Sequence, residues 1–160
     1  MKKITNILPQ HHDQSLIFDS DFESGNLFAV FRTGKYSYEL VMQNDTNSKG
    51  SNQWFYFSVE KMLQNTEYTF TIVNFTKSDS LFNYGLKPAY YSVVGNKKFG
   101  EGWHRYGKNV SYFKGEINRE NSIRYYYSLH FTVTTKYSQD KIYLAYSYPY
   151  TYTKLNAFIS

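Results

Sequence analysis

Hydrophobic and polar residues alternate with a period of two in one segment after another along this chain. From Ile123 to Thr135 the odd positions are mostly apolar or aromatic, and the even positions are mostly polar. Successive side chains of a β-strand point to opposite faces, so this pattern predicts a long, half-buried strand. Glu67–Phe75 shows the same alternation, and its β-branched residues favour a strand over a short helix.

One further segment, Asn52–Glu60, is apolar on both faces, which predicts a central strand. Trp54 and Tyr56 share one face of it, and Phe55 and Phe57 lie on the other. The other strand candidates are each bounded by turn residues: Leu16–Ser20, Asn26–Thr33, Tyr36–Gln43, Ala89–Val94, Val110–Lys114 and Lys141–Ser147. About nine strands without long amphipathic helices between them predict an all-β fold, an antiparallel β-sandwich.

Composition supports a single β domain and excludes several chemistries. The chain has 160 residues, which suits one domain, and 21% of them are aromatic, which favours strands. It contains no cysteine, so disulfides, thiolate zinc sites and cysteine nucleophiles are excluded. The basic start is followed by Pro9, Gln10 and His11 rather than an apolar signal segment, and no apolar stretch is long enough for a membrane helix. We therefore expect a cytoplasmic protein without membrane contact.

The last residues differ from the rest of the chain. Thr153 is a candidate N-cap, and Leu155, Phe158 and Ile159 follow at helical spacing. Such a short helix start is unstable alone, so its apolar stripe needs a surface on which to pack. The predicted division is a flexible lead over residues 1–15, a β-sandwich over 16–148 and a connector over 149–160.

Short motifs along the chain resemble the N-terminal domain of cytosolic carboxypeptidases, in order and in spacing. The first half carries Phe22-Glu23-Ser24-Gly25-Asn26-Leu27, Tyr38-Glu39-Leu40, Asp45, Trp54-Phe55-Tyr56-Phe57, Tyr68-Thr69-Phe70, Asn74-Phe75, Lys77 and Ser80-Leu81. The second half carries Gly85-Leu86-Lys87-Pro88, Tyr91-Ser92, Gly102-Trp103-His104-Arg105-Tyr106-Gly107, Asp140, Tyr143, Ala145 and Tyr148-Pro149-Tyr150-Thr151-Tyr152. The chain departs from the family pattern at Leu86, where Met is commoner, and at Tyr146-Ser147, where His-Cys is frequent.

The resemblance implies a β-sandwich that precedes a zinc carboxypeptidase domain of the M14 type, which removes glutamates from tubulin and other acidic proteins. That catalytic domain would hold zinc with His-x-x-Glu and a later His. None of the four histidines here has Glu three residues later, so we expect no catalysis and no cofactor in this chain, with zinc in the missing domain. The implied partners are that domain and tubulin or other polyglutamylated proteins, in the cytoplasm near microtubules or cilia.

Two groups of residues are candidate functional sites. Lys97, Lys98, Arg105 and Lys108 occur close together in sequence and form a candidate basic rim for an acidic substrate, with ordinary solvated loops as the alternative. The candidate interdomain interface comprises Tyr148, Pro149, Tyr150, Tyr152, Leu155, Phe158 and Ile159. Pro149 would stiffen the exit from the sandwich, and the aromatic and apolar side chains would pack against the following domain.

Other interpretations of the same residues remain open at this point. The His11-His12-Asp13 run is either a surface metal site or a solvated terminus, and His130 sits on a polar strand face. Tyrosines 125, 127, 146 and 148 are either a stacking platform for sugars or nucleic acid, or packing residues. The rival function is a stand-alone binding or assembly module. Nucleic-acid binding and an enzyme activity of the domain itself lack their motifs.

Overall fold

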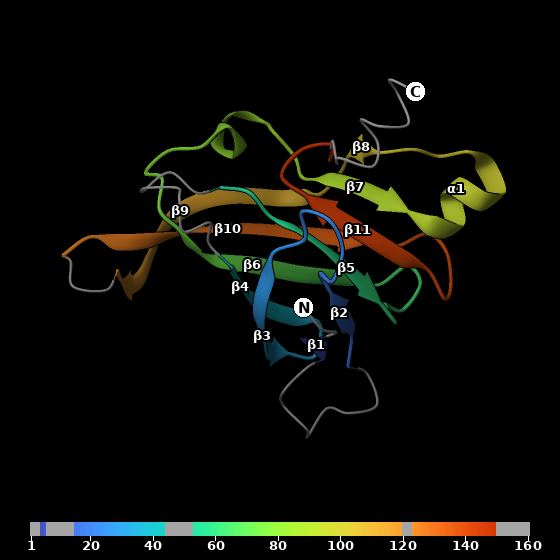
Figure 1. Ribbon diagram of the computed structural model, residues 1–160, viewed down its shortest axis with the longest axis horizontal. Helices are drawn as coiled ribbons and strands as arrows, with labels where there is room; N and C mark the ends of the chain where they lie inside the picture. The colour runs from blue at the N-terminus through green and yellow to red at the C-terminus, as the bar shows by residue number, and fades with distance from the viewer. Residues whose placement is uncertain (1–3, 6–14, 44–52, 120–122, 150–160) are drawn as a thin grey trace.

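Two β-sheets packed face to face form the protein, as the computed structural model shows (Figure 1). The structure describes residues 4–5, 15–43, 53–119 and 123–149. The first sheet, sheet A, has the order β1 (Ile4–Thr5), β2 (Ile17–Asp19), β5 (Tyr56–Glu60), β11 (Lys141–Ala145), β7 (Ala89–Ser92) and β8 (His104–Arg105). The second, sheet B, has the order β3 (Leu27–Gly34), β4 (Ser37–Met42), β6 (Glu67–Phe75), β10 (Tyr125–Thr134) and β9 (Lys108–Asn118). The predicted all-β sandwich is confirmed, and each predicted strand segment overlaps one of these strands. The segment predicted at Val110–Lys114 is too short, because β9 extends from Lys108 to Asn118.

One pairing differs from the predicted antiparallel arrangement. β4 runs parallel to β6, with Ser37–Leu40 beside Thr69–Ile72, whereas the other described pairings are antiparallel. Between these two strands the chain contributes β5 to the opposite sheet. Parallel neighbours always need such a crossover, and alternation alone does not reveal it.

The core between the sheets is built from aromatic side chains on the buried face of each strand. Phe70 of β6 lies at its centre, with its ring centroid 6.0 Å from that of Phe18 and 5.9 Å from that of Phe131. β5 is central in sheet A, as predicted, and Phe57 is fully buried. The prediction for the Ile123–Thr135 segment is wrong at its first residue. Ile123 was expected on the half-buried side of the strand, but it lies outside β10 and is 92% exposed. The β9–β10 hairpin projects beyond the body of the sandwich there (Figure 1).

The Gly-Asn-Leu motif is explained by its position between the two sheets. A Cβ on Gly25 would lie 2.3 Å from the carbonyl oxygen of Ser20, so no other residue fits at that position without movement. The neighbouring Asn26 side chain accepts from the Tyr56 N–H at 2.9 Å, donates to the Trp54 carbonyl at 3.0 Å and donates to the Gln43 carbonyl at 3.3 Å. Asn26 therefore ties the segment before β3 to the start of β5 and to the end of β4.

Within the described ranges, two helical segments interrupt the strands: η2 (Leu81–Tyr84), a 3-10 helix, and α1 (Val93–Phe99). The predicted strand Ala89–Val94 is too long at its end, because β7 stops at Ser92 and α1 begins. Ser92 is the N-cap, and its Oγ accepts from the Gly95 N–H at 2.9 Å. Asp140 also accepts hydrogen bonds from the Ser92 hydroxyl and the Val94 N–H. None of the described helices is long and apolar enough to cross a membrane.

Candidate functional site

The outer side of sheet A, away from the core, carries a cluster of aromatic rings that is here called the aromatic face. The register places Tyr143 beside Tyr91, and Ala145 beside Tyr56 and Ala89, so these side chains share the outward side of β5, β11 and β7. The aromatic face consists of Phe22, Trp54, Tyr56, Tyr91, Trp103, Tyr143 and Tyr148.

Trp103 connects the two ends of the aromatic face. Its ring centroid lies 5.4 Å from that of Tyr91, 5.9 Å from that of Tyr56 and 6.5 Å from that of Tyr148. These separations and the tilted or edge-on geometries are those that aromatic pairs prefer. The methyl groups of Ala89 and Ala145 are fully buried under this cluster, and their small size leaves room for the larger rings.

Tyr56 lies deep in the aromatic face, and this burial changes the pKa of its phenol. Its exposed fraction is 9%, and Phe22 packs edge-on against it with a centroid distance of 4.8 Å. Burial, with a smaller contribution from Tyr143, raises the pKa of Tyr56 to about 12. The phenol is therefore neutral at physiological pH and serves packing rather than charge.

Arg105, predicted as a substrate contact, is bound to the protein's own backbone. Its Nη1 donates to the carbonyl oxygen of Lys87 at 2.8 Å and to that of Tyr146 at 2.7 Å. The guanidinium also lies over the Tyr148 ring, 5.5 Å from its centroid. Arg105 thus fixes the chain just after β11, where it approaches the buried Pro149.

The other three predicted basic contacts lie on two separate elements. Lys97 and Lys98 are exposed in the last turn of α1, whereas Lys108 begins β9 in the other sheet. Lys108 forms an ion pair with Glu67, and this carboxylate raises the pKa of the Lys108 ammonium. The structure thus places the four predicted residues on α1, β8 and β9, and their contact with a substrate stays a prediction.

The described residues do not fit a metal site. No group of three or more His, Cys, Asp or Glu side chains comes together within the described ranges. His130 contacts the Thr71 hydroxyl through Nδ1 at 3.1 Å, and His104 contacts the carbonyl oxygen of Gly102 at 3.2 Å. Both imidazoles therefore have polar neighbours of the protein itself. The His11-His12-Asp13 run lies outside the described residues.

The family model for the cytosolic carboxypeptidase N-terminal domain matches residues 18–147. The chain belongs to this family. The match includes most of the aromatic face and the Gly25-Asn26 connection, and it ends next to Tyr148, at the point fixed by Arg105.

Curated relatives of this N-terminal domain are much longer than the chain. It is 40% identical over 148 residues to cytosolic carboxypeptidase 3 of Mus musculus, and 37% identical over 159 residues to cytosolic carboxypeptidase 2 of Homo sapiens. These matches cover 92% and 99% of the chain, but only 14% and 17% of the two relatives. The chain therefore corresponds to the N-terminal domain of metallocarboxypeptidase relatives.

Solved structures share the fold of this N-terminal domain. A metallo-carboxypeptidase from Burkholderia cenocepacia superposes with a TM-score of 0.61 at 19% identity, covering 90% of the chain and 32% of that protein. A metallo-carboxypeptidase from Pseudomonas aeruginosa gives a TM-score of 0.56 at 22% identity, covering 89% of the chain and 32% of that protein.

The predicted interface of the N-terminal domain lies only partly within the described residues. Tyr148 is half exposed on the aromatic face and Pro149 is buried. The remaining members of the predicted interface are outside the described residues: Tyr150, Tyr152, Leu155, Phe158 and Ile159. Sequence reasoning missed Trp103 as the ring neighbour of Tyr148, and it missed Tyr91 and Tyr143 as further members of the aromatic face. The apolar outer face predicted for Asn52–Glu60 was the signal, because an apolar outer face needs something to cover it.

Proposed function

We propose that this chain is the non-catalytic N-terminal domain of a cytosolic zinc carboxypeptidase, and that it supports the peptidase domain and helps to bind acidic protein segments. The whole protein would remove glutamates from tubulin or other polyglutamylated proteins in the cytoplasm, near microtubules or cilia. Zinc and the catalytic groups belong to the peptidase domain in this proposal, since the described residues here offer no metal site.

The observation that carries the proposal is that the aromatic face continues into the chain that leaves the sandwich. Tyr148 is in contact with Trp103 at one end of the face and with the Arg105 guanidinium. Arg105 also donates a hydrogen bond to the carbonyl of Tyr146, and its second hydrogen bond, to the carbonyl of Lys87, holds the guanidinium in place. The direction of this segment is therefore fixed by one hydrogen bond and a ring contact. A domain joined after Pro149 would begin beside an apolar surface, and burying such a surface stabilises an interface.

The relatives' lengths support the same proposal. Since the chain accounts for only 14% to 17% of two cytosolic carboxypeptidases, most of each relative is available for another domain. The rival proposal is a stand-alone binding or assembly module, in which the aromatic face would meet another molecule instead of a domain of the same protein.

The deciding experiment is the mass of the native gene product in its source cells, measured by mass spectrometry of the immunopurified protein. We expect a product tens of kilodaltons larger than the 19.0 kDa of this chain, with peptides that contain His-x-x-Glu. A product close to 19.0 kDa would refute the proposal in favour of the stand-alone module.

A surface variant tests the role of the aromatic face in the isolated chain. We expect the wild-type chain to self-associate through this face, and Tyr148→Asp to shift it toward the monomer in sedimentation velocity. Phe28→Asp is the matched control, because Phe28 on β3 is 66% exposed and Tyr148 is 51% exposed. Equal effects of the two variants would show that general surface polarity, and not the aromatic face, controls association.

A further inference from the structure

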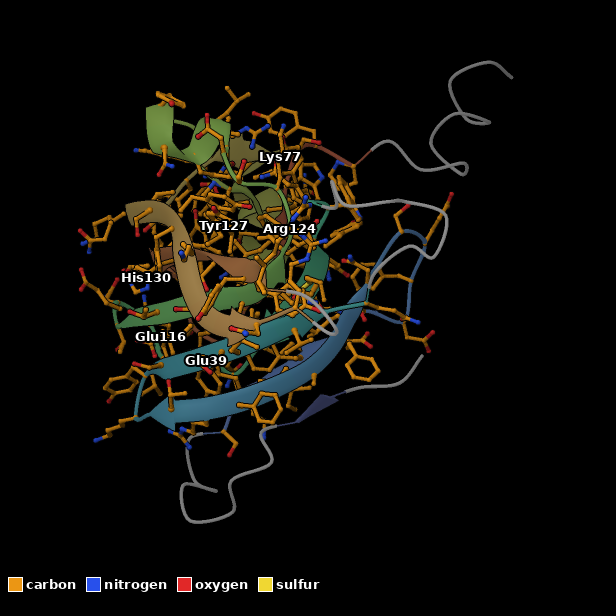
Figure 2. The ribbon with its side chains drawn as sticks, turned by 90° about the vertical axis from the view of Figure 1, so that its left-hand side faces the viewer. Glu39, Lys77, Glu116, Arg124, Tyr127 and His130 are labelled. Atoms are coloured by element: carbon orange, nitrogen blue, oxygen red, sulfur yellow. The ribbon has the colours of Figure 1, made fainter. Side chains whose placement is uncertain are left out.

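A pocket lined by positive charges lies between the β6–η2 segment and the β9–β10 hairpin. The hairpin lies at the end of the molecule opposite α1 (Figure 1). The pocket is open to solvent and has a volume of about 480 Å³. Its described lining contains four cationic side chains and no carboxylate; the cations are Lys77, Lys114, Arg119 and Arg124. Figure 2 shows Lys77 and Arg124 near Tyr127, which also lines it. This site is here called the cationic pocket.

The backbone that carries Lys77 is held against the hairpin by a buried tyrosine. The Tyr112 hydroxyl donates to the carbonyl oxygen of Lys77, and the Tyr112 ring stacks on Tyr127 with a centroid distance of 5.7 Å and an angle of 9°. Tyr112 is only 5% exposed, so this connection is protected from water. The two sides of the cationic pocket are therefore fixed relative to each other.

The cations on the hairpin side are also positioned by neighbours. The Lys114 ammonium lies 4.9 Å from the centroid of the Tyr125 ring, a distance at which a cation is attracted to the ring face. The Arg119 N–H donates to the Arg124 carbonyl at 2.8 Å, so these two residues face each other across the hairpin. Thr76 lines the same pocket, and its buried hydroxyl has no hydrogen-bond partner among the described residues.

We propose that the cationic pocket binds an acidic peptide segment with several carboxylates. The cations come from both sides of an open pocket, an arrangement that suits charges distributed along a chain. Phosphate sites instead commonly use backbone N–H groups of glycine-rich loops or helix N-termini, and the described residues that line this pocket include no glycine and no helix residue. Tyr125, Tyr127 and the 92% exposed Ile123 provide apolar walls for the methylene groups of glutamate side chains.

This inference deepens the proposed function. It rests on that function only in the expectation that the natural acidic segment belongs to a polyglutamylated protein. It also assigns acidic-segment binding to a different place from Lys97 and Lys98, which lie on α1 at the other end of the molecule (Figure 1). The two locations can therefore be distinguished by variants that change the net charge equally.

The test is fluorescence anisotropy of a labelled hexaglutamate peptide with the 160-residue chain. We expect saturable binding that weakens when NaCl is raised from about 50 mM to about 200 mM, because the ions screen the attraction. Hexaglutamine should not bind.

Variants of the chain then test where the peptide binds. Lys77→Glu/Arg119→Glu should raise the Kd for hexaglutamate at least about tenfold, whereas the matched control Lys97→Glu/Lys98→Glu should change it by less than about twofold. Thermal unfolding checks that both variants fold, and Lys77→Gln/Lys114→Gln provides a second, milder test of the pocket.

Several outcomes would overturn the proposal. Equal losses in the two charge-reversal variants would indicate attraction by net charge, and a larger loss in the α1 variant would return the binding site to α1. Displacement of the peptide by inorganic phosphate, but not by sodium chloride of equal ionic strength, would identify a compact oxyanion as the ligand. Absence of hexaglutamate binding would refute the acidic-peptide site. The proposed role of the domain would still be tested separately, by the native mass and by the Tyr148→Asp variant.

Discussion

Removing the Asn26 side chain is the sharpest available test of how the two sheets are connected. Its amide makes three hydrogen bonds, to the N–H of Tyr56, to the carbonyl of Trp54 and to the carbonyl of Gln43. Asn26→Ala deletes all three and leaves partly buried backbone groups without their partner. At about 1 kcal/mol for each bond, the expected loss is about 2–4 kcal/mol of the free energy of unfolding. That is a large share of the roughly 5–15 kcal/mol typical of a domain.

The assay is urea unfolding followed by fluorescence of the two tryptophans, Trp54 and Trp103. We expect a lower midpoint with an unchanged slope, because the surface exposed on unfolding is the same. Asn83→Ala is the control, since the Asn83 side chain accepts a single hydrogen bond from the Tyr112 N–H at 3.2 Å; it should lose about 1 kcal/mol. The reasoning is wrong if Asn26→Ala is no more destabilising than Asn83→Ala.

Two further predictions concern buried groups elsewhere in the fold. Asp140→Ala should lower the free energy of unfolding by about 2–3 kcal/mol, because the Ser92 hydroxyl and the Val94 N–H lose their acceptor; a loss below about 0.5 kcal/mol in urea unfolding would contradict this role. The pKa of Tyr56 is raised to about 12, above its unfolded value, so its contribution to stability is complete below about pH 10 and is lost as the pH rises toward 12. Tyr56→Phe should therefore reduce the fall in Tm between about pH 9 and pH 11.5, and an unchanged fall would show that Tyr56 does not control it.

The strands were predictable because alternation directly reports which side of a strand is buried. Glu67–Phe75 could be recognised in this way, and the central strand in Asn52–Glu60 was recognisable because both of its faces are apolar. α1 could not, because the caps that stabilise its first turn include Asp140, 46 residues away from Val94 in sequence. Without the hydrogen bond from Val94 to the Asp140 carboxylate, turn-forming residues such as Gly95 predict a loop at this position.

The candidate sites were less accessible to sequence reasoning than the fold. Basic side chains close in sequence were expected to act together, yet Arg105 holds backbone carbonyls and Lys108 pairs with Glu67. The cationic pocket was missed because the strand Val110–Lys114 was predicted to end too early. β9 continues to Asn118, and this extension brings Arg119 opposite Arg124.

The parallel pairing of β4 with β6 has a consequence for how the domain folds. β3 and β4 are neighbours in sequence and can form as a local hairpin, but β6 can pair with β4 only after the chain has crossed to the other sheet and returned. The entropy of closing that loop must be overcome before the central contacts of sheet B form. We therefore expect refolding in the slow range of milliseconds to seconds that is typical of sandwiches rich in long-range contacts, with β5 placed before sheet B is complete.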